Sequence, residues 1–185
     1  MLSFTSIFFW MISSFTFYRC LSVGTTDGFN IYNCDPFSKA YTQCKWSILA
    51  CSTPTLTQNL LSAEGGGIGI AEMLFCTSLV AVVGSGDQPT LSPRKLIIKN
   101  TSTQKTICEL NFVSSILAVK MNKKRMIVVM ETKIHVYDIA SMKILHTIDT
   151  ATNNAGLCSL CPGDNSYVAY PGTKGKSVPY SILCC

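Results

Sequence analysis

The feature that most constrains the fold is a succession of short apolar runs, each bounded by turn-forming residues. The runs are rich in Val, Ile, Thr, Tyr and Phe, which fit the pleated surface of a β-strand. No stretch keeps apolar residues at helical spacing over the dozen positions that a helix needs. The pattern therefore predicts an all-β chain, built as a sandwich, a barrel or a propeller. The expected strands are 20–24, 29–33, 71–75, 79–84, 95–100, 106–112, 116–121, 126–131, 134–139 and 144–149.

A repeat favours the propeller among these architectures. Strand-like runs end at Asn33, Asn100 and Asp138, and each is followed by a small polar turn and a further apolar run. Asn100 and Asp138 are 38 residues apart, close to the roughly 40 to 45 residues of a four-stranded propeller blade. The longer interval after Asn33 indicates an insertion at 44–61 and a long turn at 84–93. About three blades and a fragment are therefore expected, with the pattern fading at 173–185 after a last run at 166–170.

Composition supports a folded chain in a reducing compartment. Of the 185 residues, 48% are hydrophobic and 14% charged, enough apolar material for one sizeable core. Ten cysteines are present, but Cys20, Cys76 and Cys108 lie inside apolar runs, where a free thiol packs as a small hydrophobe. The net charge of +5 mildly favours anionic partners. The sequence contains no basic recognition helix, so nucleic acid is not the expected partner.

The N-terminus leaves a second interpretation open. Residues 2–18 carry no charge and are compatible with a signal or anchor segment, although no basic residue precedes them and Ser and Thr interrupt them. Asn100 begins a glycosylation sequon. The alternative is therefore a membrane-anchored or secreted cysteine-rich β protein. The preferred hypothesis is that residues 1–20 are an atypical terminus preceding the β domain.

Motifs for catalysis, metals and cofactors are incomplete. His135 and His146 fall in strand runs without a ligand set, and Cys158 with Cys161 forms only half of a zinc signature. Gly175-Lys176-Ser177 lacks the first glycine of a phosphate-binding loop. The sequence therefore predicts no enzyme, no metal site and no cofactor.

Two basic turns are the candidate binding sites. Pro93 and Arg94 stand where a long loop enters a strand, and Lys123, Lys124 and Arg125 join two apolar strands. Charged turns of this kind keep strands soluble, and they also suit an acidic partner surface. We predict that both turns project from the rim of the domain.

Several of these runs resemble the opening blades of the PROPPIN (WIPI) family. The similar segments are 21–36, 72–100, 107–150 and 156–172, and they include the stretch SSILAVKMNKKR at 114–125. Together they make up more than half of the chain.

The resemblance implies a WD-repeat-like, seven-bladed β-propeller that acts as a non-catalytic scaffold in autophagy. Such a protein would be cytoplasmic and peripheral at the phagophore assembly site and at endosomal or vacuolar membranes. It would bind phosphatidylinositol 3-phosphate or 3,5-bisphosphate and recruit autophagy proteins. The loop around Pro93 and Arg94 resembles the one that meets the lipid-transfer partner of the autophagosome, which makes these two residues the leading candidates. The second-ranked candidates are Lys123, Lys124 and Arg125.

The departures from the family are as specific as the similarity. The F/L-R-R-G motif that carries the family's lipid-binding arginines is absent, and the only arginines are Arg19, Arg94 and Arg125. Residues 1–20, 44–61 and 173–185 depart from the family pattern around a partial propeller at 21–172. We therefore expect autophagy partners at the early blades and no specific phosphoinositide site in these 185 residues.

Overall fold

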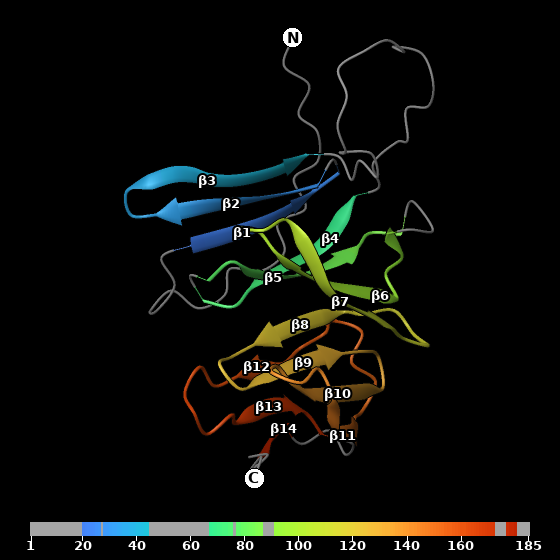
Figure 1. Ribbon diagram of the computed structural model, residues 1–185. Helices are drawn as coiled ribbons and strands as arrows, with labels where there is room; N and C mark the ends of the chain where they lie inside the picture. The colour runs from blue at the N-terminus through green and yellow to red at the C-terminus, as the bar shows by residue number, and fades with distance from the viewer. Residues whose placement is uncertain are drawn as a thin grey trace, which may run out of the picture.

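The computed structural model describes residues 20–26, 28–44, 67–75, 77–86, 91–172 and 177–180. These residues form antiparallel strands joined by turns and loops (Figure 1). The strands are β1 (Cys20–Thr25), β2 (Gly28–Cys34), β3 (Phe37–Cys44), β4 (Ile68–Met73), β5 (Leu79–Gly84), β6 (Lys95–Asn100), β7 (Lys105–Asn111), β8 (Ala118–Met121), β9 (Arg125–Val129), β10 (Lys133–Asp138), β11 (Ile144–Asp149), β12 (Ser159–Leu160), β13 (Val168–Pro171) and β14 (Ser177–Tyr180).

The strands make four consecutive sheets in chain order. The sheets are β1-β2-β3, β4-β5-β6-β7, β8-β9-β10-β11 and β12-β13-β14. The first strands of neighbouring sheets lie together, because β1 contacts β4, β4 contacts β8, and β8 contacts β12. Ser22 of β1 ties the first two sheets by donating a hydrogen bond to the carbonyl oxygen of Ala71 at 2.6 Å. Each sheet is therefore a blade whose first strand faces a common axis, the arrangement of a propeller.

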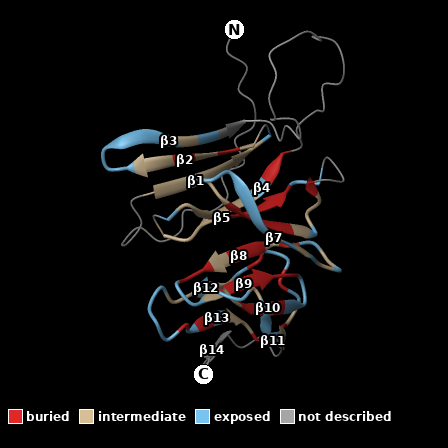
Figure 2. Cartoon of the chain, viewed as in Figure 1, coloured by how far each residue is buried: buried red, intermediate tan, exposed pale blue. Residues whose placement is uncertain are grey.

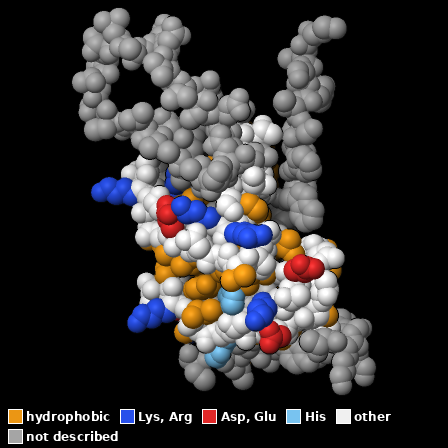
Figure 3. All heavy atoms as spheres, turned by 90° about the vertical axis from the view of Figure 1, so that its right-hand side faces the viewer, with side chains coloured by type: hydrophobic (Ala, Val, Ile, Leu, Met, Phe, Trp, Pro, Cys, Tyr) orange, Lys and Arg blue, Asp and Glu red, His pale blue; other side chains and the backbone are white. Residues whose placement is uncertain are grey.

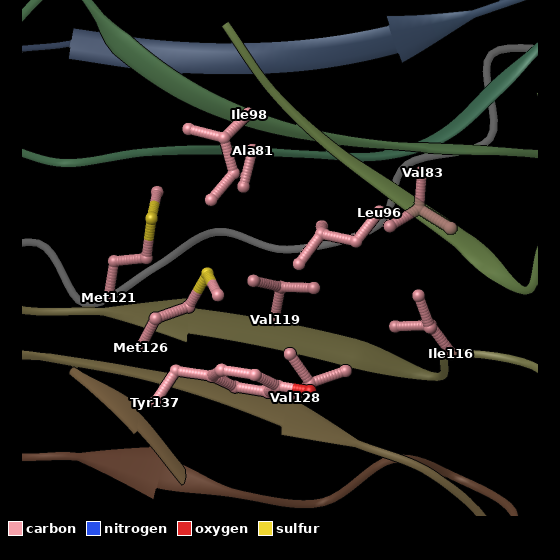
Figure 4. Close-up of a cluster of buried hydrophobic side chains, with 10 residues drawn as sticks. All are labelled: Ala81, Val83, Leu96, Ile98, Ile116, Val119, Met121, Met126, Val128 and Tyr137. Atoms are coloured by element: carbon pink, nitrogen blue, oxygen red, sulfur yellow. The ribbon is translucent and has the colours of Figure 1, made fainter. Parts of the chain in front are cut away.

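The core lies between the faces of neighbouring sheets. Branched apolar residues fill the inner strands, while the outer strands β7 and β11 are largely exposed (Figure 2). Side chains from β5 and β6 meet side chains from β8, β9 and β10 between the second and third sheets (Figure 4). Stacked blades therefore stabilise one another, as in other repeat architectures. The ten buried members are Ala81, Val83, Leu96, Ile98, Ile116, Val119, Met121, Met126, Val128 and Tyr137.

Close backbone approach between the first two sheets depends on a glycine. A Cβ atom at Gly24 of β1 would overlap the backbone carbonyl oxygen of Ile68 in β4. Only a residue without a side chain lets these two strands come together at that point. Gly24 therefore sets the spacing between the first and second blades.

The ten predicted strands are confirmed as β1, β2 and β4 to β11, with boundaries that differ by at most three residues. The run at 166–170 corresponds to β13. The expectation that the pattern fades at 173–185 is wrong in part, because β14 pairs with β13 and places Pro179 opposite Ala169. Proline is tolerated there because β14 is the last strand of its described sheet.

Two of the other segments lie mostly outside the described residues. This applies to the apolar terminus 1–20, apart from Cys20, and to the expected insertion 44–61, apart from Cys44. Among the residues that the structure describes, no helix has the length and apolar character needed to cross a membrane.

Candidate partner-binding site

The turn at Pro93 and Arg94 joins β5 to β6 and is held firmly at its base. The backbone N–H of Phe112 donates to the carbonyl oxygen of Arg94 at 2.9 Å, and that of Ile116 donates to Pro93 at 2.8 Å. Ser92 supports the turn from within, because its Oγ accepts a hydrogen bond from the Arg94 N–H at 3.2 Å. The connection from β7 to β8 therefore braces this turn against the body of the second blade.

The Arg94 side chain is exposed, and within the described part of the chain it has no ion-pair partner. The neighbouring Lys95 is paired with Glu109 at 2.7 Å, so the carboxylate of that pair is already neutralised. The guanidinium of Arg94 presents a planar fork of donors that suits carboxylates and phosphates. The predicted site therefore presents a cation that has no ion pair with the described residues, on a backbone fixed by hydrogen bonds.

The second basic turn, between β8 and β9, is organised by Asn122. The side-chain oxygen of Asn122 accepts hydrogen bonds from the N–H groups of Lys124 and Arg125, at 2.9 and 2.7 Å. Its amide nitrogen reaches the next blade, donating to the Cys161 carbonyl oxygen and to Ser166 Oγ, both at 3.0 Å. Lys123 and Lys124 are exposed on this support, which fits the prediction of a projecting turn.

Arg125 differs from the two lysines because it already has an anionic partner. Its Nη1 lies 2.8 Å from Asp138 Oδ1 on β10, and it also donates to the Lys124 carbonyl oxygen at 3.1 Å. Side-chain and backbone hydrogen bonds from Ser141 hold the pKa of Asp138 below its usual value, and Arg125 lowers it further. The β8–β9 turn therefore offers two available cations, and Arg125 fixes the turn to the body of its blade.

The structure does not bring the two basic turns together. Pro93 is hydrogen-bonded to Ile116, just before β8 begins, whereas Lys123 follows the end of β8. Ile116 and Lys123 are seven positions apart along a stretch that includes β8, which corresponds to roughly 20 Å at 3.3 Å per extended residue. The turns consequently lie at opposite ends of the strands. Basic side chains are spaced apart, with apolar ones between them, over the face shown in Figure 3.

A buried charged pair near the common axis was missed by the sequence analysis. Lys120 Nζ of β8 lies 3.8 Å from Glu72 Oε1 of β4, and both side chains are mostly buried. Burial raises the pKa of Glu72 to about 7, and Lys120 lowers it in part. Since 3.8 Å is too long for a hydrogen bond, desolvation prevails, and Glu72 is partly protonated at neutral pH. The partners are far apart in sequence, and no local motif indicates them.

The residues considered for metal binding have other contacts. His135 Nδ1 lies 2.9 Å from Thr147 Oγ1 on the neighbouring strand, and its ring is tilted against Phe112 at 5.9 Å between ring centres. The described residues hold no cluster of three His, Cys, Asp or Glu side chains able to hold a metal ion. Cys158 and Cys161 are free thiols, as are Cys34 and Cys108. Burial raises the pKa of Cys158 to about 11, which makes it a poor nucleophile at neutral pH.

The relatives of this chain are autophagy proteins. It is 45% identical over 167 residues to autophagy-related protein 18 of Yarrowia lipolytica. The aligned region covers 89% of this chain and 37% of the relative. The protein of the same name from Dictyostelium discoideum is 45% identical over 159 residues, covering 86% and 37%. The chain therefore spans little more than a third of the length of these relatives.

Solved structures agree with the fold and the family. The complex of KlAtg21 with the coiled-coil of AgAtg16 is similar with a TM-score of 0.63 and 37% identity, covering 82% of this chain and 43% of that one. Kluyveromyces lactis Hsv2 shares the fold with a TM-score of 0.62 at 16% identity, covering 86% and 40%. The family model named PROPPIN matches residues 26–181. The four blades around a common axis, the autophagy relatives and the family match lead to one conclusion: this chain belongs to the PROPPIN family.

Proposed function

We propose that this chain is part of a non-catalytic propeller scaffold that recruits autophagy proteins to phosphoinositide-bearing membranes during autophagosome formation. Its PROPPIN membership and the similarity to autophagy-related protein 18 support this role. One similar structure is a complex with a coiled-coil, which supports protein partners for propellers of this kind. The scaffold would act in the cytoplasm as a peripheral protein of the phagophore assembly site and of endosomal or vacuolar membranes.

The protein-binding surface is proposed to centre on Pro93 and Arg94. The observation that carries this assignment is an exposed guanidinium, without an ion pair among the described residues, on a turn whose backbone is braced by Phe112 and Ile116. Because the backbone of the turn is already ordered, binding has to order only the side chain of Arg94, which can hold a carboxylate through two parallel hydrogen bonds. The partner proposed for this turn is the lipid-transfer protein of the autophagosome.

The exposed Lys123 and Lys124 are proposed as a second, weaker docking point. Each is a strongly hydrated point charge on a flexible stem, so together they favour acidic surfaces without selecting a geometry. Arg125 is proposed to contribute indirectly, by fixing the turn through Asp138.

A pull-down with the recombinant lipid-transfer partner tests the assignment. Arg94→Glu should reduce capture at least tenfold, whereas Lys105→Glu, a charge reversal on the exposed strand β7, should leave it unchanged. Because Arg94 contributes little to the core, the free energy of unfolding of its variant should stay within about 0.5 kcal/mol of that of the wild type. Equal capture by wild type and Arg94→Glu would remove Arg94 from the site.

A further inference from the structure

The turn that carries Arg94 contains a sequence pattern that protein kinases recognise. Residues 92–95 read SPRK, with a proline directly after the serine and a basic residue at the third position after it. Proline-directed serine/threonine kinases select this pattern. The only other Ser or Thr followed by Pro is Thr53, and the third position after it is Leu56. Ser92 is therefore the position of the chain that satisfies the whole pattern.

The Ser92 hydroxyl lies where a kinase can reach it. The residue is partly exposed, and its Oγ accepts the N–H of Arg94 at 3.2 Å. The following proline restricts Ser92 to extended backbone, the form in which peptide substrates lie in a kinase cleft. Three backbone hydrogen bonds, accepted by the carbonyl oxygens of residues 92–94, hold the turn. Local opening of these few bonds exposes the segment without unfolding the blade.

A phosphate on Ser92 would lie within reach of the exposed guanidinium of Arg94. The hydroxyl that would carry it already contacts the backbone of Arg94, and Arg94 has no ion pair among the described residues. The phosphate adds a charge of about −1.5 to −2 at neutral pH and three acceptor oxygens, which a guanidinium binds through paired hydrogen bonds. The neighbouring Lys95 is engaged by Glu109 at 2.7 Å. Arg94 is therefore the cation that the phosphate would engage.

Resting on the proposed function of the Arg94 turn, we propose that Ser92 is a phosphorylation site for a proline-directed kinase and that its phosphate closes the turn to acidic partners. In the reaction, Ser92 Oγ attacks the γ-phosphorus of ATP, and the bond from that phosphorus to the bridging oxygen of ADP breaks. The hydroxyl proton passes to the catalytic carboxylate of the kinase, and ADP leaves. The phosphate ester then occupies the guanidinium of Arg94. A carboxylate that approaches the turn meets a net negative charge and is repelled.

The modification is tested by incubating the chain with a recombinant cyclin-dependent kinase and ATP and by locating the phosphate with mass spectrometry. Phosphate on Ser92 is the expected result. Pro93→Ala should lower the rate of its incorporation at least tenfold, because it removes the residue that the kinase selects. Phosphate on Thr53 alone, or on no residue, would overturn the proposal.

The contact between the phosphate and Arg94 is tested by a phosphorus NMR titration of the phosphorylated chain, which needs no partner. The second pKa of a phosphoserine is normally about 6. It should lie lower in the wild type than in Arg94→Gln, because a guanidinium favours the doubly charged phosphate. Lys105→Gln, on the exposed strand β7, is the control and should keep the wild-type value. Equal values in the wild type and in Arg94→Gln would overturn the closing of the turn.

Capture by the recombinant lipid-transfer partner separates failure of this inference from failure of the proposed function. Complete phosphorylation of Ser92 should reduce capture at least tenfold, and kinase treatment of Ser92→Ala should leave the capture of that variant unchanged. If Arg94→Glu loses capture and the phosphorylated wild type does not, the Arg94 site stands and the switch is overturned. If neither change affects capture while the titration shows the contact, the modification site stands and the proposed function of the turn fails.

Discussion

Asn122 and Ser166 are 44 positions apart in the sequence and are joined by a buried hydrogen bond of 3.0 Å, donated by Asn122 Nδ2 to Ser166 Oγ. This bond connects the turn that carries Lys123 to the fourth blade. The same amide also bonds the backbone of its own turn and of Cys161. One side chain therefore fixes a candidate binding turn and the contact between two blades.

Asn122→Ala should consequently destabilise the protein by about 3 kcal/mol, because it leaves several buried polar groups without partners. The change is measured by urea unfolding, monitored by far-ultraviolet circular dichroism. Asn154→Ala, at an exposed position of the β11–β12 connection, is the control and should stay within about 0.5 kcal/mol of wild type. A loss at Asn122 no larger than at Asn154 would contradict the structural role.

Gly24→Ala should lower stability by about 2 kcal/mol, because the added methyl group would meet the carbonyl oxygen of Ile68 and push two inner strands apart. Gly163→Ala is the matched control, since the nearest atom to its added Cβ, Cys161 Sγ, lies at 3.6 Å, an ordinary contact. Thermal unfolding of the two variants in parallel gives the comparison. Identical melting temperatures would show that the first two blades can separate without cost.

The raised pKa of Glu72 predicts that the stability of the protein decreases as the pH rises. Its folded pKa of about 7 lies above the usual 4.5, so the native state holds a proton that the unfolded state loses between these values. Stability should therefore fall as pH rises from 4.5 to 7, by about 3 kcal/mol at most, and then level off.

Replacing Glu72 by Gln removes this titration and should flatten the decline. Unfolding free energies at pH 5 and pH 8, compared with those of wild type, measure the difference. Glu131→Gln, at an exposed position, should leave the wild-type decline in place. A decline that persists in Glu72→Gln would assign the pH dependence to other groups.

The 185 residues should not discriminate phosphatidylinositol 3-phosphate from other anionic lipids. A phosphorylated headgroup needs several converging donors, but Arg94 stands alone on its turn and Arg125 is paired with Asp138. The exposed lysines can give only diffuse attraction, of order 1 kcal/mol each, which salt weakens.

Liposome flotation at physiological salt checks this expectation, with phosphatidylserine vesicles of matched charge as the comparison. Equal binding to both vesicles is the expected result. A clear preference for the phosphoinositide would reveal a headgroup site that the sequence did not indicate.

The fold was largely predictable, because alternating apolar residues are buried between blades and therefore leave a visible pattern. Strands that lack that pattern were indicated poorly or not at all. β3 was expected only as a run after the turn at Asn33, because it contains Ser38, Lys39 and Thr42 and lies at the outside of its sheet. β12, which was missed, has only two residues. Outer and very short strands bury little apolar surface, so composition does not reveal them.

The candidate site was predictable only where the local sequence determines whether a side chain is exposed or paired. The exposure of Arg94, Lys123 and Lys124 follows from turn positions between strands. The pairing of Arg125 with Asp138 could have been found, because these residues are opposite each other in the β9–β10 hairpin. The contact of Glu72 with Lys120 depends on how separate blades pack, which local pattern does not determine.

The separation of the two basic turns along β8 has a consequence for assembly. If both turns bind as proposed, a partner seated on Arg94 would leave Lys123 and Lys124 uncovered, and two ligands would occupy the propeller at once without competing. A single ligand that engaged both ends would need a linker of at least about seven extended residues to cover roughly 20 Å. A ligand with such a linker would gain avidity from the second contact, whereas one with a shorter linker would gain none.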